Sequence, residues 1–474
     1  MGTFYWYDLE TFGIDARYDR IAQFAGMRTD EALNPVAEPD MFFCQPVFDY
    51  LPDPSSCLVT GITPQQAQQE GVSEVEFSRR VHDIFSLSGS CVAGYNSIRF
   101  DDEFVRSLLY RNFYDPYRRE YANGNSRWDL IDLVRGCYAL RPEGIEWPLR
   151  EDGYPSFKLE DLTTANNLTH TAAHDALSDV EATIQMARLI REHQPKLFDF
   201  YFQLRQKARV KTMVDADNMK PFVHVSGMIP AARGCLSLMV PLAQHPRNNN
   251  AVICYDLAFS PQALIELDVE EARELVYTAD ADLPEGMERI HLKGIHLNKS
   301  PFVAPLSVLK GVDLERIGCD YARCQKHLKQ LQEAADLVSM KSRAIFDQAY
   351  ASDNDDVDGM IYDGFFSPQD RQQLDQVRGM DAEALGDLPF TFTDQRADEL
   401  IWRYRARHFS DNLSNTEQLQ WLQQCQQRLN VKFGVDFEYW FTLLEQLRSE
   451  HSSEEAARVL DDCEQFVLDK SFDF

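Results

Sequence analysis

Two acidic residues, one position apart, stand near the start of the chain in the segment TFYWYDLETFG. Asp8 and Glu10 lie in a run of aromatic and apolar residues, and on a β-strand this spacing places both side chains on one face. Two neighbouring carboxylates in apolar surroundings are unfavourable unless a cation neutralises them. The pair alone is a weak signal, because surface strands often carry two acids, but it indicates a metal-binding strand end.

Two later segments add residues of the same chemistry. Asp101 and Asp102 follow the strand-like run CVAGYN and open an amphipathic helix; we expect one to cap that helix and the other to face the first strand. In AAHDALSDVEATIQ, His174 and Asp179 are five residues apart, which separates them by about 140° around a helix. We therefore expect His174 in the loop before the helix, Asp175 as the N-cap, and Asp179 one turn inside.

Taken together, these residues follow the order D-x-E, D, H-x(4)-D, which suits hydrolysis assisted by metal ions. Mg²⁺ prefers oxygen ligands, and two such ions can hold the attacking and leaving oxygens of a phosphodiester. A neutral imidazole with a pKa near 6.5 can take the proton from the attacking water. The constellation thus predicts a phosphodiesterase site.

The pattern of predicted elements divides the 474 residues into three domains. Residues 1–192 alternate strand-like and helical runs, which indicates an α/β domain. Residues 195–350 contain short β-rich runs broken by Pro, Gly and Asn, followed by a helical stretch. The acidic segment 352–359 predicts a linker, and the remainder of 352–474 shows the spacing of an all-α domain.

Charge and composition exclude several classes of protein. The chain has 47 Lys and Arg against 76 Asp and Glu, a net charge of −29, which excludes attraction of phosphate or anionic lipid to the whole surface. Residues 201–250 reverse this balance with seven basic and two acidic residues, so an anion-binding surface is expected there. There is no run of 18 apolar residues and no basic region typical of a signal peptide, and the ten cysteines show no regular spacing. We expect reduced thiols, no membrane association and a cytoplasmic location.

The order of the acidic residues resembles the DEDDh group of 3′→5′ exonucleases, whose shared fold is ribonuclease-H-like. Longer blocks, including GYNSIRFDDEF, NSRWDLIDL, PSFKLEDLT and MKPFVHVSGM, resemble the bacterial exodeoxyribonuclease I family over essentially the whole chain. The resemblance implies an exonuclease domain, an SH3-like β-barrel domain with appended helices, and an all-α C-terminal domain. It also implies processive removal of mononucleotides from the 3′ end of single-stranded DNA in repair or recombination, with two Mg²⁺ ions per site and Mn²⁺ as an expected substitute.

The resemblance assigns roles to individual residues. It implies that Asp8, Glu10, Asp101 and Asp179 bind the metal ions, that Glu10 also contacts substrate, and that His174 is the general base. The family commonly has D-Y-E where this chain has Asp-Leu-Glu; we expect little consequence, because the middle residue of a strand triplet points away from the metals.

Between the second and third acidic clusters, aromatic residues alternate with basic ones, as in proteins that grip a single strand without reading its sequence. Some of these residues, Trp128, Tyr110 and Tyr114 among them, are expected in the core instead. A further basic run in WRYRARHF is expected either to close the track or to be an ordinary helix surface. The resemblance implies that the strand is contacted by Arg106, Tyr117, Tyr121, Arg135 and Lys158. Lys220, from the basic island at 201–250, is expected to extend this track, and the run in the third domain is Arg403, Arg405 and Arg407.

Two alternatives remain open on the sequence. One is a nuclease of the same catalytic group that acts on RNA or proofreads a polymerase, because discrimination depends on the space around the 2′-OH rather than on the catalytic residues. The other is a non-catalytic single-strand-binding adaptor, which the presence of all five catalytic-type residues disfavours. By resemblance, the acidic tail of single-stranded DNA-binding protein is an expected partner, and a monomer is expected.

Overall fold

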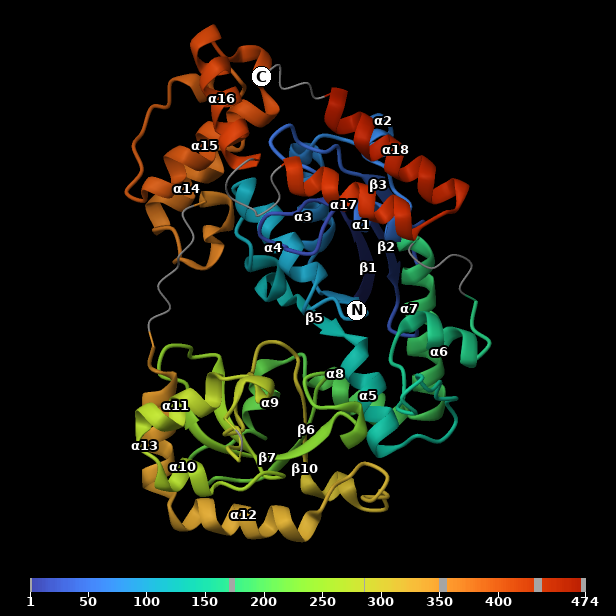
Figure 1. Ribbon diagram of the computed structural model, residues 1–474, viewed down its shortest axis with the longest axis vertical. Coiled ribbons are helices and arrows are strands. Elements are labelled where there is room, and N and C mark those ends of the chain that lie inside the picture. Colours follow the sequence, from blue (N-terminus) through green and yellow to red (C-terminus); the bar gives the residue numbers. More distant parts are fainter. Residues whose placement is uncertain (1, 170–174, 285, 349–355, 430–436, 470–474) are drawn as a thin grey trace. The chain divides into compact units, whose positions relative to one another are not determined.

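The computed structural model describes residues 2–169, 175–284, 286–348, 356–429 and 437–469 (Figure 1). The chain forms two compact units, each assembled from segments that are distant in sequence. The first unit contains Met1–Ser126, His170–Glu181 and Ser352–Phe474, and the second contains Arg127–Thr169 and Ala182–Ala351. One helix, α7 (Ala176–His193), runs from the first unit into the second.

A five-stranded sheet with the order β3-β2-β1-β4-β5 carries the amino-terminal segment. Strand β1 is antiparallel to β2 and parallel to β4. A central strand is covered on both faces, which explains why the β1 sequence is almost continuously aromatic and apolar. The strands are β1 (Thr3–Thr11), β2 (Ile21–Thr29), β3 (Asp40–Phe43), β4 (Ser90–Gly94) and β5 (Ser126–Asp129).

Aromatic side chains make up much of the core beside this sheet. Tyr5, Tyr7 and Phe24 of the strands pack with Phe85, at the end of α3, and share a buried cluster with Phe104 of α4. The helices of this segment are α1 (Pro54–Thr60), α2 (Pro64–Glu70), α3 (Glu74–Phe85) and α4 (Asp101–Arg111). The packing fixes the position of β1 relative to the start of α4, and both of these elements carry residues predicted for the active site.

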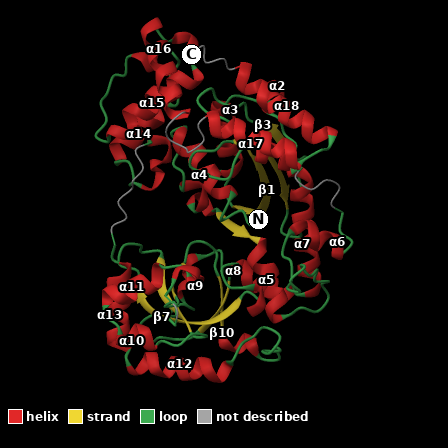
Figure 2. Ribbon diagram, in the orientation of Figure 1, coloured by secondary structure: helices red, strands yellow, loops and turns green. Residues whose placement is uncertain are grey.

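The carboxyl-terminal segment is helical, as predicted, and its described residues 356–429 and 437–469 contain no strand (Figure 2). It shares two apolar cores with the amino-terminal segment inside the first unit. In one of them Trp440 packs among residues that include Phe12 and Tyr50, and its indole donates a hydrogen bond to the Pro52 carbonyl. The helices are α14 (Pro368–Val377), α15 (Gln395–His408), α16 (Asn415–Gln427), α17 (Phe437–Glu450) and α18 (Glu454–Asp469).

The prediction of an acidic linker at 352–359 is wrong for its described part. Residues 357–362 form a short 3-10 helix, and Asp356 and Asp358 are buried at 1% and 0% exposure. Their carboxylates are neutralised by arginines, including Arg403 and Arg428. Acidic residues clustered between two domains indicate solvent exposure only when no buried cation faces them.

The second unit is built around an antiparallel sheet with the order β10-β6-β7-β8-β9. Its strands are β6 (Phe222–Val225), β7 (Leu236–Gln244), β8 (Ala251–Asp256), β9 (Leu292–His296) and β10 (Phe302–Pro305). Its helices are α5 (Leu130–Leu140), α6 (Leu159–Ala165), α8 (Pro195–Gln203), α9 (Lys207–Lys211), α10 (Gln262–Glu266), α11 (Val269–Tyr277), α12 (Tyr321–Glu333) and α13 (Ala335–Phe346). The predicted succession of α/β, β-rich and all-α segments is therefore confirmed.

Among the residues that the structure describes, none of the helices combines the length and the apolar character needed to cross a membrane.

Candidate active site

Strand β1 places Asp8 and Glu10 on one face, as their spacing predicts. Asp8 pairs with Ala25 of β2 and Glu10 with Gln23, and the register shifts directly after Glu10. Asp8 is half-buried and Glu10 is 7% exposed. The two carboxylates therefore stand at the end of a central strand, where the backbone is held by its neighbours.

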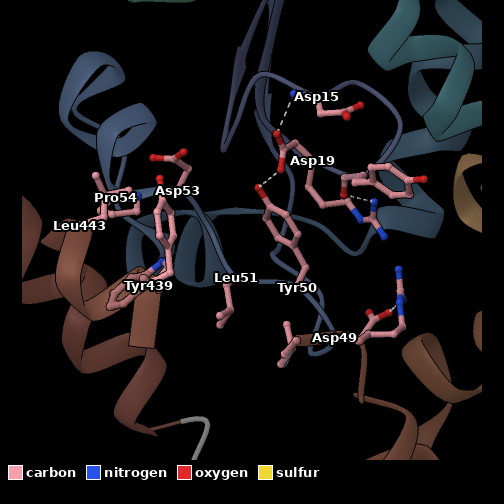
Figure 3. Close-up of a pocket in the computed structure, with 14 residues that line it drawn as sticks. Asp15, Asp19, Asp49, Tyr50, Leu51, Asp53, Pro54, Tyr439 and Leu443 are labelled. Atoms are coloured by element: carbon pink, nitrogen blue, oxygen red, sulfur yellow. Dashed lines mark hydrogen bonds and ion pairs between the residues drawn. The ribbon is translucent and has the colours of Figure 1, made fainter. Parts of the chain in front are cut away.

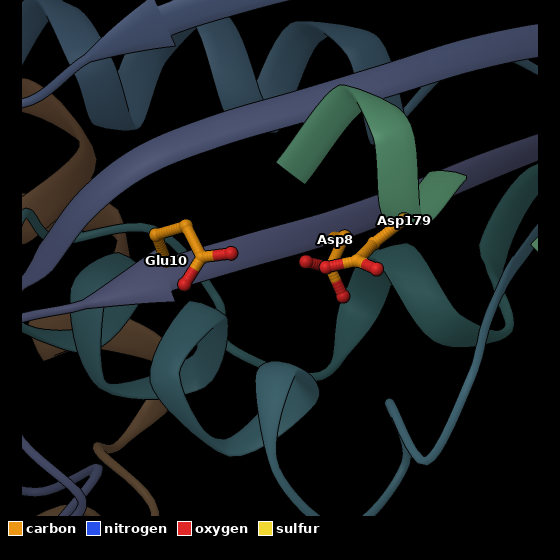
Figure 4. A group of neighbouring side chains, drawn as sticks. All are labelled: Asp8, Glu10 and Asp179. Carbon is orange, nitrogen blue, oxygen red and sulfur yellow. The ribbon is translucent and has the colours of Figure 1, made fainter. Parts of the chain in front are cut away.

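The third carboxylate comes from the first turn of α7. Asp175 precedes this helix and accepts a hydrogen bond from the Ser178 amide at 3.0 Å, which confirms the predicted N-cap. This cap fixes the start of the helix and places Asp179 beside the strand (Figure 4). Carboxylate oxygens of Asp8, Glu10 and Asp179 all lie within 4.8 Å of one another.

Burial and repulsion between neighbouring charges change the acidity of two members of this trio, Asp8 and Glu10. The pKa of Asp8 is raised well above its usual value by burial and by the charges of Asp101 and Asp179. The pKa of Glu10 is raised to about 9 by burial and by the charges of Asp8, Asp179 and Asp175. The carboxylates cannot all ionise near neutral pH without a compensating cation. Three oxygen donors of this kind fit a hard divalent cation, which favours the ionised form of a carboxylate.

Asp101 belongs to the site electrostatically but stands outside the close trio. It is the first residue of α4, it is 4% exposed, and its charge contributes to the raised pKa of Asp8. The expectation that Asp101 or Asp102 caps this helix is wrong, because Phe100 occupies the cap position and no side chain caps the helix. The two acids instead face side chains elsewhere in the fold.

The partner of Asp102 is a feature that sequence reasoning missed. Its carboxylate accepts hydrogen bonds from the Tyr7 hydroxyl at 2.8 Å and from the Arg119 guanidinium at 2.6 Å. Tyr7 adjoins Asp8, and Asp102 adjoins Asp101, so this buried contact ties the two acidic clusters together. The local sequence pattern does not predict this contact, because the three residues come from a strand, a helix and a 3-10 turn.

The loop that follows Glu10 is held by Tyr50. The Tyr50 hydroxyl donates to the Phe12 carbonyl at 2.7 Å and lies 3.1 Å from the Asp19 carboxylate, which also accepts from the Asp15 amide (Figure 3). Asp15, Asp19 and Tyr50 line a cavity of about 250 Å³. Burial raises the pKa of Asp19 to about 6, and the hydrogen bonds fix the chain just beyond the end of β1.

His174, the predicted general base, lies outside the described residues. The described part of the chain resumes at Asp175, immediately after it. Its role stays a prediction.

Three residues predicted to contact a strand lie in the first unit. The Arg106 guanidinium is buried, bonds to Glu103 at 2.7 Å and Glu120 at 2.8 Å, and stands over the Tyr117 ring at 5.1 Å. Tyr117 is half-buried, whereas Tyr121 is 68% exposed. Trp128 and Tyr110 are buried core residues, as expected, whereas Tyr114 is only half-buried.

The other three lie in the second unit. Arg135 is bonded to Asp132 at 2.7 Å and stands over the Phe157 ring. Lys158 precedes α6 and is highly exposed, with Glu160 at 3.4 Å. Lys220 precedes β6 and is also exposed. Of the six residues, the lysines and Tyr121 present the most accessible side chains.

The basic run of α15 does not form an exposed track. Arg403 and Arg407 are buried in ion pairs with Asp356, Asp49 and Asp358, and Arg405 pairs with Glu417 at 2.6 Å. Their alternate spacing resembles a charged helix surface in sequence, but the acidic partners come from segments that are distant along the chain.

Three family models match consecutive parts of the chain. An exonuclease model matches residues 5–187, the exonuclease I SH3-like domain matches 205–348, and the exonuclease I C-terminal domain matches 355–470.

Individual proteins are similar over nearly the full length. Exodeoxyribonuclease I of Escherichia coli (strain K12) is 46% identical over 432 residues, which cover 91% of this chain and 90% of that protein. The crystal structure of E. coli exonuclease I in complex with a dA16 oligonucleotide matches with a TM-score of 0.95 and 43% identity, over 99% of this chain and 100% of that one. The zinc-bound form of the E. coli complex with single-stranded DNA matches with a TM-score of 0.94, at the same identity and coverage.

The raised pKa values predict how stability depends on pH in the metal-free protein. A carboxyl whose pKa is higher in the folded state stabilises the fold below its unfolded pKa, and this contribution is lost as pH rises through the folded pKa. For Glu10, whose usual pKa of 4.5 is raised to about 9, the free energy of unfolding should fall between about pH 5 and pH 9. We expect Glu10→Gln to be more stable than the wild type at pH 8 by on the order of 5 kcal/mol, measured by urea unfolding in EDTA.

Added divalent cation should reverse this difference by stabilising the wild type more than Glu10→Gln. The matched control is Glu143→Gln, because Glu143 is exposed and its replacement should leave both the pH dependence and the metal response unchanged. A wild type equally stable at pH 5 and pH 8 in EDTA would contradict the electrostatic account of the site.

Proposed function

The chain belongs to the exonuclease I family, and on this premise we propose that its carboxylate site hydrolyses single-stranded DNA processively from the 3′ end with two Mg²⁺ ions. The chain is a 3′→5′ exonuclease that acts on single-stranded DNA. The observation that carries the proposed chemistry is the trio of carboxylates whose oxygens lie within 4.8 Å. The E. coli relative of known structure, which binds a single-stranded oligonucleotide and in one form zinc, supports a divalent metal site.

The carboxylates and the histidine of the site are proposed to have different roles. Asp8, Glu10 and Asp179 would hold the cations, and Asp101 adds negative charge from the start of α4. A bound divalent cation supplies a Lewis acid for the phosphodiester and a water of lowered pKa. His174 would take the proton from the attacking water, and a neutral imidazole suits this task near pH 7.

Exposed basic and aromatic side chains are proposed to hold the strand. Tyr121 offers an accessible ring for base stacking, and Lys158 and Lys220 can each hold a phosphate as a point charge. Arg106 and Arg135 are already bonded to carboxylates; a strand contact through either would require it to share or exchange those partners. We therefore rank the two lysines and Tyr121 first among the proposed contacts.

A panel of nucleic acids tests the proposed substrate. We expect Mg²⁺-dependent release of 5′-mononucleotides from labelled single-stranded DNA, little release from blunt duplex, and none in EDTA. The affinity for the strand should fall only moderately as the salt concentration rises, because only a few phosphates are contacted. Equal cleavage of duplex and single strand, preferred cleavage of RNA, or strand binding without cleavage would each contradict the proposal, and the last two correspond to the alternatives left open by the sequence.

Removing one metal-binding carboxylate should separate turnover from strand binding. Asp8→Ala or Asp179→Asn should lose metal-supported cleavage while retaining much of the affinity for single-stranded DNA, because exposed groups elsewhere hold the strand. Single-turnover cleavage and fluorescence anisotropy measure the two properties. The control Asp83→Asn alters an exposed acid of α3 that pairs with Arg79, and it should cleave as the wild type does; near-normal turnover in either site variant would refute the metal assignment.

The general base has a distinct signature. His174→Ala should reduce turnover by roughly 10²–10⁴-fold, the usual contribution of general base catalysis. It should also abolish the decline of kcat toward acid pH that protonation of an imidazole produces. His451→Ala, at an exposed histidine between α17 and α18, serves as the control. If His174→Ala loses turnover but keeps the pH profile of the wild type, another residue is the general base.

We further infer a monomer in the cytoplasm that works in DNA repair or recombination and binds the acidic tail of single-stranded DNA-binding protein. These proposals rest on the family resemblance, and the basic island at 201–250 is chemically suited to an acidic peptide. Calorimetry with a tail peptide measures the binding of the partner, sedimentation of the purified chain measures its oligomeric state, and cell fractionation measures its location.

A further inference from the structure

A strongly basic pocket lies in the first unit, although the chain as a whole is acidic. Its volume is about 320 Å³, and it is bounded by the end of α3, the segment 114–125 and α14. Four arginines and two aspartates line it: Arg118, Arg119, Arg371, Arg378, Asp115 and Asp375. The charged lining therefore sums to 4 − 2 = +2, in a protein whose net charge is −29.

Two of the four arginines are matched by the two aspartates. Arg371 bonds to Asp115 at 2.5 Å, and Arg378 bonds to Asp375 at 2.9 Å. Arg119 is paired with Asp102, which does not line the pocket, so the positive charge that no carboxylate matches is that of Arg118. The Arg118 side chain is exposed and makes no hydrogen bond or ion pair with any residue that the structure describes.

Arg119 carries the strongest indication of a ligand. It is 3% exposed, and only one guanidinium nitrogen is bonded, at 2.6 Å to Asp102. Its Nε and Nη1 find no hydrogen-bond partner among the described residues, although the group stands 4.7 Å from the centre of the Phe85 ring. Buried donors without partners are costly and rare, so two of them on one arginine lining a pocket indicate a site for an acceptor.

The neighbouring walls are planar and aromatic. The His82 ring stacks on the Tyr114 ring, with ring centres 4.3 Å apart. The Arg378 guanidinium also lies over the Tyr114 ring, 4.1 Å from its centre. Burial lowers the pKa of His82, so the imidazole is neutral at pH 7 and does not add charge. The pocket thus combines guanidinium groups with flat aromatic surfaces.

We propose that this pocket binds a phosphate group. Guanidinium forks match the oxygens of phosphate and bind them bidentately, and the volume exceeds what a bare ion needs. The phosphate can be free, can belong to a mononucleotide, or can belong to the backbone of a single strand. The proposal is independent of the cleavage chemistry, because none of the carboxylates of the candidate active site lines the pocket.

Binding without catalysis tests the proposal. The full-length protein is titrated in EDTA with inorganic phosphate, with deoxyadenosine 5′-monophosphate and with a single-stranded oligonucleotide, using calorimetry or ³¹P NMR. Arg118→Gln is the main variant, because Arg118 has no protein partner to lose, and Arg371→Gln is the second. Arg150→Gln is the control, since Arg150 is exposed and paired with Asp152 at 2.7 Å but does not line the pocket.

We expect Arg118→Gln and Arg371→Gln each to weaken phosphate binding by about tenfold, the effect of losing one charge-assisted hydrogen bond. Arg150→Gln should bind as the wild type does, and thermal unfolding of Arg118→Gln should be unchanged. A loss confined to phosphate and the mononucleotide assigns the pocket to small phosphates, and a loss confined to the oligonucleotide assigns it to the strand. If no probe binds the wild type, or if all bind Arg118→Gln equally well, the proposal is wrong.

Discussion

Repulsion between buried carboxylates is the constraint around which the first unit is arranged. Asp8, Glu10 and Asp179 are brought within 4.8 Å of one another by a strand and a helix whose positions are fixed by unrelated contacts. The fold holds three groups together that would separate in a flexible chain, and it leaves a cation to supply the missing attraction. The elements that surround the trio hold the three carboxylates in place against that repulsion.

The contacts that hold the carboxylates in place come from many parts of the first unit. Aromatic packing against α3 and α4 immobilises β1, Tyr50 holds the backbone beyond Glu10, and Asp175 fixes the first turn of α7. The contact of Asp102 with Tyr7 and Arg119 joins β1 to α4. Each of these interactions is modest in free energy, but together they restrict the oxygens to positions that a metal ion can use.

Local pattern was sufficient to predict some of this arrangement. The alternation of a strand made Asp8 and Glu10 neighbours, and the five-residue spacing of His174 and Asp179 led to the cap at Asp175, since both inferences depend only on backbone geometry. Long-range charge pairing could not be predicted. The pairing of Arg106 with Glu120 was not expected from the local sequence, and neither was the burial of Arg407 against Asp49.

The buried charges that join the two ends of the chain have a consequence for biosynthesis. Asp49 is fully buried against Arg407 and Arg428, which follow it by more than half the sequence, and Trp440 covers apolar residues near Pro52. While the chain is still being translated, Asp49 lacks both of these arginines, and the apolar residues near Pro52 are not yet covered by Trp440. The amino-terminal segment therefore cannot complete its core until α15 to α18 have left the ribosome. During that interval its apolar surface is exposed, and exposed apolar surface is what chaperones bind.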